Sequence, residues 1–251
     1  MEGRMNMSEF WKNINTYYKR YGLHATIVRI MDKLTGQSRV DYMTWYQKTK
    51  PTKQVLKIQR ETTFPYMPEI LVIVLENKSG FHRLADSLKN QTYSRWKLCK
   101  IRELNDVVEI LKEAKEEYVL ITQPEDELSV DAFFQCVKSL NADRTIEAIY
   151  SDDDIIKNET EYEEPAMKPD LNLDMFRSCN YIHNFLLVKK KLCQKLFEEC
   201  LESWNGQIDW KYDFIFRCIE EKRSIHHIAK VLYHRNVEHV QVCDEQERKA
   251  I

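Results

Sequence analysis

Short runs rich in apolar residues recur along the middle of the chain and alternate with segments of helical periodicity. Four runs predict strands: Ile70–Leu75, Trp96–Ile101, Tyr118–Thr122 and Ile146–Tyr150. The first is unbroken and apolar, which is the pattern of a strand that is covered on both faces. Three helices are expected between them, around Phe81–Leu88, Val107–Ala114 and Val130–Leu140. This alternation predicts an α/β domain with a doubly wound, mainly parallel sheet and helices on both faces.

The expected helix starts come from short polar residues. Asn105 or Asp106 is predicted to cap the second of these helices, and Ser129 to open the third. Before the domain, Phe10 to about Leu34 has aromatic and apolar residues at helical spacing with Lys and Arg between them. A further helix is expected after Pro51, with Thr52 as its N-cap, ending at the prolines of 64–68. We therefore predict a basic helical N-terminal arm (1–64), the α/β domain (65–240) and a polar C-terminal tail (241–251).

Charge is distributed unevenly along the chain. The net charge is −2, which argues against a nucleic-acid binder with a broad basic face. Residues 1–60, however, hold twelve Lys or Arg against four Asp or Glu. A basic amphipathic arm can contact anionic lipid headgroups, and it can equally dock on the acidic remainder of the chain.

The small number of glycines and the spacing of the cysteines exclude several classes of enzyme and of metal-binding protein. The five glycines are too far apart for a G-x-G-x-x-G turn, a Walker A loop or a G-x-S-x-G elbow. Seven cysteines without a C-x-x-C pair predict reduced core residues rather than disulfides or a zinc site. The longest aliphatic run, Ile70–Leu75, is far shorter than the about 20 residues of a membrane span. We expect a soluble, cytoplasmic protein.

Two acidic clusters follow predicted strands. Gln123–Glu127 comes after the third strand, and Ser151–Asp154 after the fourth. Ligands of parallel sheets bind beyond the carboxyl ends of the strands. Crowded carboxylates repel one another unless a cation neutralises them, and a divalent ion that holds a diphosphate would do so. A single cluster is more simply a solvated, helix-capping loop, but two at one edge favour a ligand site.

Five sequence blocks, in this order, carry a resemblance to a known family: Asn90–Cys99, Tyr150–Asp154, Met167–Asp170, Asn180–Ile182 and Ala229–Arg235. Over residues 17–236 the chain resembles bacterial family 2 glycosyltransferases of polysaccharide gene clusters. The resemblance implies a GT-A fold and transfer of a sugar from a nucleotide diphosphate donor to an acceptor hydroxyl. It also implies a divalent metal (Mg²⁺ or Mn²⁺), a carboxylate base, and a glycan or lipid-linked acceptor at the inner membrane face.

The resemblance also implies roles for individual residues. The metal ligands would be Asp126, Glu125 and His234. The donor would contact Asp152, Asp153 and Glu125. The acceptor would contact Asn180 and His183. The catalytic carboxylate that the chain retains would be Asp213. Asp209 could replace the missing base only through a local shift of the loop at Asn205–Gly206, and it is also a good N-cap for the helix that follows it.

Three departures from the family pattern leave two hypotheses open. Gln123 replaces the leading Asp of the metal signature, and Arg102–Asn105 replaces a pair of Asp residues expected near the nucleotide base. Lys211 occupies the position of the general base, where an ordinary lysine is protonated at neutral pH. The chain is therefore either an active glycosyltransferase or a non-catalytic relative that serves as a binding or partner subunit. The adjacent His226 and His227 are expected to share a strand face without a special role.

Overall fold

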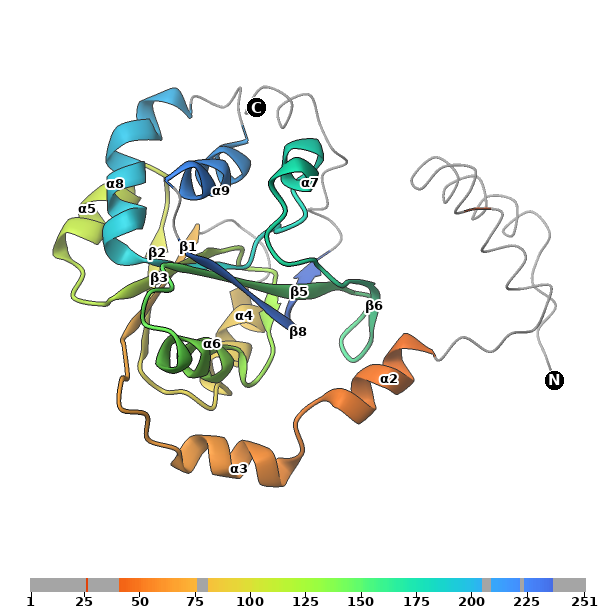
Figure 1. Ribbon diagram of the computed structural model, residues 1–251. Helices are drawn as coiled ribbons and strands as arrows, with labels where there is room; N and C mark the ends of the chain where they lie inside the picture. The colour runs from red at the N-terminus through yellow and green to blue at the C-terminus, as the bar shows by residue number, and fades with distance from the viewer. Residues whose placement is uncertain (1–25, 27–40, 76–80, 205–208, 222–223, 237–251) are drawn as a thin grey trace. The chain divides into compact units, whose positions relative to one another are not determined.

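The computed structural model describes residues 26, 41–75, 81–204, 209–221 and 224–236 (Figure 1). It divides into two compact units, Met1–Trp45 and Tyr46–Ile251. The predicted helix from Phe10 to Leu34, apart from Thr26, and the predicted tail 241–251 lie outside the described residues. The domain boundaries at 64 and 240 therefore stay predictions.

The described strands of the second unit form one eight-stranded sheet in the order β2-β1-β3-β7-β5-β8-β4, with β6 paired to β5. Their bounds are β1 Ile70–Leu75, β2 Trp96–Ile101, β3 Tyr118–Thr122, β4 Glu127–Leu128, β5 Ala148–Ile156, β6 Tyr162–Ala166, β7 Leu186–Lys189 and β8 Ile225–Asn236. The pairings make β1, β2, β3, β5 and β8 run one way and β4, β6 and β7 the other. The sheet is mainly parallel, as predicted.

Helices cover both faces of this sheet. Their bounds are α4 Phe81–Lys89, α5 Asp106–Glu113, α6 Ala132–Ala142, α7 Leu173–Ser178, α8 Lys190–Cys200 and α9 Trp210–Glu220. In Figure 1, α5, α8 and α9 lie on one side of the sheet, and α4 and α6 on the other. Alternate residues of β1 point into these two cores, with Leu71 and Ile73 on the first side and Ile70 and Val72 on the second. The predicted α/β class is confirmed.

Several local predictions are confirmed. The predicted bounds of β1, β2 and β3 match the structure. β1 and β3 are apolar segments that are mostly buried, whereas β2 lies at the sheet edge with Lys97 and Lys100 exposed. The remaining helical elements are α2 Tyr42–Thr49, α3 Lys53–Glu61 and the 3₁₀ turn Leu201–Ser203. The Thr52 side chain caps α3 by accepting a hydrogen bond from the backbone N–H of Val55. Four cysteines are buried core residues: Cys136, Cys193, Cys200 and Cys218.

The second acidic cluster is the main correction. The fourth strand was expected to end at Tyr150, with Ser151–Asp154 in the loop beyond it. In the structure, β5 runs through the cluster to Ile156, and all of its residues are buried. A strand tolerates three buried aspartates here because a basic or hydrogen-bonding side chain meets each of them: His227 meets Asp152, Arg235 meets Asp153 and His234 meets Asp154.

Three smaller predictions are also wrong. The helix α6 begins after Asp131, and the Ser129 hydroxyl instead donates to the carbonyl oxygen of Val231 in β8. Neither expected cap serves α5: Asn105 makes no capping hydrogen bond through its side chain, and the Asp106 carboxylate accepts from the backbone N–H groups of residues 102 and 103. His226 is exposed, whereas His227 points to the opposite face of β8 and contacts Asp152.

No helix in the described part of the chain combines the length and apolar content that a bilayer crossing requires.

Candidate functional site

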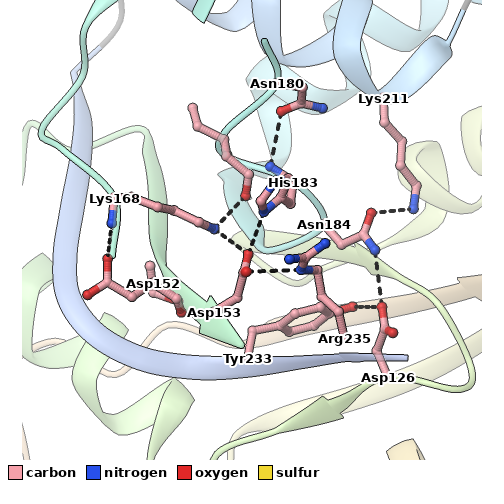
Figure 2. A network of polar contacts seen from close by, with 12 residues as sticks. Asp126, Asp152, Asp153, Lys168, Asn180, His183, Asn184, Lys211, Tyr233 and Arg235 are labelled. Carbon is pink, nitrogen blue, oxygen red and sulfur yellow. Dashed lines mark hydrogen bonds and ion pairs between the residues drawn. The ribbon is translucent and has the colours of Figure 1, made fainter. Parts of the chain in front are cut away.

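Polar side chains from six separate segments converge beyond β3 and along β5 and β8 (Figure 2). Asp126 lies in the turn between β3 and β4, and Asp153 lies within β5. The segment after β6 contributes Lys168, and the segment before β7 contributes His183 and Asn184. The first turn of α9 contributes Lys211, and the end of β8 contributes Tyr233 and Arg235.

Asp126 is buried and accepts hydrogen bonds at both carboxylate oxygens. Its Oδ2 accepts from the Tyr233 hydroxyl at 2.5 Å and from Nδ2 of Asn184 at 3.2 Å. Its Oδ1 accepts from the backbone N–H of Asn236 at 2.8 Å. Burial raises the pKa of the Asp126 carboxyl, although these donors and the charge of Lys211 act against the rise.

Asn184 connects Asp126 to Lys211. Its Oδ1 accepts a hydrogen bond from Nζ of Lys211 at 3.0 Å, on the opposite side of the amide from its contact with Asp126. Burial lowers the pKa of the Lys211 ammonium, and the charges of Asp126, Asp209 and Glu125 offset part of that change. The base position of the family pattern therefore holds a desolvated lysine that faces carboxylates.

Asp153 is the centre of a second set of contacts, as Figure 2 shows. Its fully buried carboxylate lies 2.6 Å from Nζ of Lys168 and 2.8 Å from Nδ1 of His183 through Oδ2. The other oxygen, Oδ1, accepts from Nε of Arg235 at 2.9 Å. Burial alone would raise the pKa of the Asp153 carboxyl, but Lys168, His183 and Arg235 hold it well below its usual range.

The two neighbours of Asp153 point elsewhere. Asp152 accepts from the backbone N–H of Lys168 at 2.8 Å and contacts Nε2 of His227 at 2.9 Å. Asp154 contacts Nδ1 of His234 at 2.5 Å. His234 lies on the other face of β8 from Tyr233 and Arg235, because adjacent strand residues alternate.

These positions separate the predicted metal ligands. Asp126 faces Tyr233, whereas His234 uses Nδ1 for Asp154 and Nε2 for the hydroxyls of Ser129 and Tyr46. Glu125 is buried in the same turn as Asp126. Across the described residues, no group of three or more His, Cys, Asp or Glu side chains is arranged to hold a metal ion. In the described part of the chain, the side chains therefore form no site for the divalent metal that the resemblance implies.

The predicted acceptor residues do lie together. The backbone N–H of His183 donates to Oδ1 of Asn180 at 3.0 Å, and His183 has a left-handed backbone with a φ of 61°. Such a backbone is uncommon for a residue with a Cβ, and it is often found at functional sites. The His183 side chain is 28% exposed.

Both predicted catalytic carboxylates have structural contacts on α9. Asp209 is the N-cap of the helix, and its Oδ1 accepts from the backbone N–H groups of Lys211 and Tyr212. Asp213 is buried, and its Oδ2 accepts from Nε1 of Trp204 and Nε of Arg217, each at 2.6 Å. These contacts fix the start of α9, and the catalytic assignments stay predictions.

A small pocket with a cavity volume of about 30 Å³ lies beside this network. The side chains of His183, Asn184 and Lys211 contribute polar groups to its lining. Apolar side chains of β3, β7, α8 and α9 form the rest of the lining. A mainly apolar lining with a few convergent polar groups is typical of small-molecule sites.

Sequence reasoning missed four residues that build the network: Lys168, Asn184, Tyr233 and Arg235. Lys168, Tyr233 and Arg235 lie inside two of the blocks that carry the family resemblance, Met167–Asp170 and Ala229–Arg235. Their place in these blocks was the sequence feature that could have identified them. Asn184 follows the block Asn180–Ile182 by two positions. Nothing in its sequence surroundings indicates that it bridges a carboxylate and a lysine.

Sequence comparisons give two relatives. No protein-family model matches the chain. The uncharacterised protein y4gI of Sinorhizobium fredii is 34% identical over 81% of this chain and 26% of that protein. The O-antigen biosynthesis protein RfbC of Myxococcus xanthus is 25% identical over 71% of this chain and 13% of that protein. The chain thus spans about a quarter or less of the length of these relatives.

Structural comparisons give further similarities. The S. aureus TarS fragment 1–349 in complex with UDP-GlcNAc has a TM-score of 0.48 and 12% identity, covering 67% of this chain and 58% of that chain. The mannosyltransferase PcManGT from Pyrobaculum calidifontis, in complex with GDP-Man and Mn²⁺, has a TM-score of 0.44 and 15% identity, covering 72% of this chain and 62% of that chain.

Proposed function

We propose that this chain is a glycosyltransferase, which moves a sugar from a nucleotide diphosphate donor to an acceptor hydroxyl in the biosynthesis of a surface polysaccharide. The order of the five sequence blocks supports the family assignment. The relative RfbC, an O-antigen biosynthesis protein, supports the polysaccharide context.

One observation carries the proposal. Residues from four of the blocks that resemble glycosyltransferases, or directly beside them, meet around one carboxylate. Asp153 contacts Lys168, Arg235 and His183, which lies just beyond the block Asn180–Ile182. One of these residues, His183, also lines the pocket beside the end of β3, and ligands of such sheets bind beyond strand ends.

The proposed reaction is an in-line displacement at the anomeric carbon of the donor. The acceptor oxygen forms a bond to that carbon while the bond to the diphosphate breaks. We assign the donor side to Glu125, Asp152 and Asp153, and the acceptor side to Asn180 and His183. Because Lys168 and Arg235 neutralise Asp153, this carboxylate would orient those two cations rather than meet the diphosphate itself.

A second candidate function is a binding or partner subunit without turnover. The arrangement of α9 favours it: Lys211 occupies the base position, and both nearby carboxylates have structural contacts. The two candidates differ in turnover and can share donor binding.

Donor binding and turnover are measured on the wild type and on Asp126→Asn, with the 96%-exposed Asp174→Asn as a matched control. A nucleoside diphosphate at 100 times its Kd stabilises the native state by about 2.7 kcal/mol, which raises Tm by about 5–10 °C. The panel is UDP, GDP, CDP and dTDP, each with and without Mg²⁺ or Mn²⁺, followed by hydrolysis and transfer assays with the matching sugar donors.

The outcomes separate the candidates. A Tm shift together with turnover that falls in Asp126→Asn and not in Asp174→Asn supports the glycosyltransferase. A Tm shift without turnover supports the binding subunit. The absence of any shift across the panel contradicts the glycosyltransferase and favours a subunit that binds a partner or an acceptor.

A further inference from the structure

We propose that His183 is the general base of the transfer reaction and that Asp153 is the positioning residue that holds its imidazole. The inference rests on the proposed function and adds the group that removes the acceptor proton.

The contact between the two residues fixes which nitrogen can react. Nδ1 of His183 lies 2.8 Å from Oδ2 of Asp153, a carboxylate whose side chain is fully buried. An ionised carboxylate accepts hydrogen bonds only, so Nδ1 carries the hydrogen and Nε2 keeps its lone pair. Nε2 lies on the far edge of the ring from Asp153, and the side chain lines the pocket.

The carboxylate itself is held from both sides. Lys168 contacts Oδ2 and Arg235 contacts Oδ1, so Asp153 has little freedom to rotate away from the imidazole. The histidine is held as well, because the Asn180 side chain accepts from its backbone N–H and stabilises the left-handed turn. A reactive group that is fixed on both sides is the arrangement that catalysis requires.

Burial favours the neutral form of His183, and charged groups of both signs face the ring. They come from Asp153 on β5, Lys168 after β6 and Arg235 on β8, while Lys211 of α9 lines the same pocket. Burial lowers the pKa of the His183 imidazole below its usual value, and Lys168 and Arg235 add to this effect against the opposing charge of Asp153. A neutral imidazole with a bare Nε2 is the form that accepts a proton.

The other groups near the pocket are less suited to this step. Lys211 accepts a proton only after it has lost its own, and Asp209 and Asp213 are engaged by α9 and by Trp204. In the proposed step, the acceptor hydroxyl gives its proton to Nε2 of His183. Its oxygen forms the bond to the anomeric carbon, and the electron pair of the breaking C–O bond leaves with the diphosphate. The proton then passes to solvent.

The test compares His183→Asn and His183→Gly with His226→Asn, a matched exposed histidine on β8. Asparagine and glycine both tolerate a positive φ, so neither variant strains the turn at residue 183. Donor hydrolysis is the probe, since water can take the place of the unidentified acceptor and gives its proton to the same base. UDP-, GDP-, CDP- and dTDP-linked hexoses are used with the full chain, and binding of the matching nucleoside diphosphate is measured separately.

We expect both His183 variants to hydrolyse the donor about 10²- to 10⁴-fold more slowly than the wild type, with nucleotide affinity unchanged. Added imidazole should restore part of the rate in His183→Gly, which has room for it, and leave the wild type unaffected. In the wild type the rate should rise with pH through the lowered pKa of His183 and then level off. His183→Asn should lose this dependence.

The wild type alone reports on the proposed function. If it binds no donor, or binds one without hydrolysis or transfer, the glycosyltransferase proposal fails and the base assignment fails with it. If the wild type turns over and His183→Asn stays within about threefold of it, or imidazole gives no rescue in His183→Gly, only the His183 assignment is overturned.

Discussion

Asp153 shows how a single buried charge can organise a site. Its carboxylate is fully buried, yet it meets Lys168, His183 and Arg235 from three other segments of the chain. Removing an ion from water costs several kcal/mol, and the cost is recovered only where partners of opposite charge are well placed. The three contacts therefore bind β8, the segment after β6 and the turn at His183 to one point of β5.

The first prediction concerns this charge. We expect Asp153→Asn to lower the free energy of unfolding at pH 7 by about 3–5 kcal/mol, because Lys168 and Arg235 lose their buried counter-ion. Urea unfolding measures the loss. Asp174→Asn, a change at a carboxylate that is 96% exposed, should alter stability by at most about 0.5 kcal/mol.

The same substitution has a pH signature. The native pKa of Asp153 lies below the value of about 3.9 of an unfolded chain, so its contribution to stability is fully present above about pH 4. The contribution is lost as the pH falls below that value towards the native pKa. The stability difference between wild type and Asp153→Asn should therefore shrink in acid. A difference that stays constant from pH 7 to pH 3 would contradict the assignment.

At the scale of elements, α9 depends on the two aspartates at its start. Asp209 caps the helix, and Asp213 connects its first turn to Trp204 and Arg217. Both contacts are local and involve only α9 and the turn before it. The helix in turn determines where Lys211 meets Asn184 at the edge of the pocket.

We predict that Asp209→Ala lowers the free energy of unfolding by about 1 kcal/mol, because two backbone N–H groups lose their acceptor. Asparagine is also a good N-cap, so Asp209→Asn should change the free energy of unfolding by only about a few tenths of a kcal/mol. Thermal or urea unfolding of both variants measures this. The Asn variant also separates the structural contact from a catalytic one. If its stability is retained while donor hydrolysis falls 10²-fold or more, Asp209 is the base and our assignment of His183 is wrong.

The predictability of each element follows from where its partners lie. β1 is a run of six apolar residues, and its bounds follow from that run alone because burial on both faces needs no particular partner. β5 differs, because Asp152, Asp153 and Asp154 are polar and resemble a loop after a short strand. Only their contacts with His227, Lys168 and His234 allow the strand to continue. Local periodicity does not contain those contacts.

The residues of the candidate site were also predictable only where the local sequence pattern places them. The sequence placed Asp126 after β3 correctly, since a turn directly beyond a predicted strand lies at the sheet edge. The sequence analysis predicted Asp126 and His234 as ligands of one metal ion. Side chains alternate along β8, however, so His234 points away from Tyr233 and therefore from Asp126. This separation follows only when both the extent of β8 and its register with its neighbours are known. The pairing of Asp153 with His183, thirty positions apart, requires the whole fold.

At the scale of the whole molecule, charge is segregated along the chain. Residues 1–60 hold eight more basic than acidic residues, while the complete chain has a net charge of −2. A transferase with a lipid-linked acceptor would gain from attraction to anionic headgroups, because its second substrate diffuses in the plane of the membrane. Attraction of this kind is worth about 1 kcal/mol per Lys or Arg near the surface.

We predict that, at low salt, the full chain sediments with vesicles that contain about one third phosphatidylserine. Deletion of residues 1–40 removes seven basic and three acidic residues. This deletion should lower the partition coefficient of the protein between vesicles and water on the order of 100- to 1,000-fold. Neutral phosphatidylcholine vesicles are the control. Binding should be lost near 1 M salt, where the Debye length falls to about 3 Å. Two outcomes would contradict this prediction: sedimentation of the deletion variant like that of the full chain, or binding that does not change with salt. In either case the basic segment does not act through headgroup charge. Docking on the acidic part of the chain then becomes the better explanation of its basic composition.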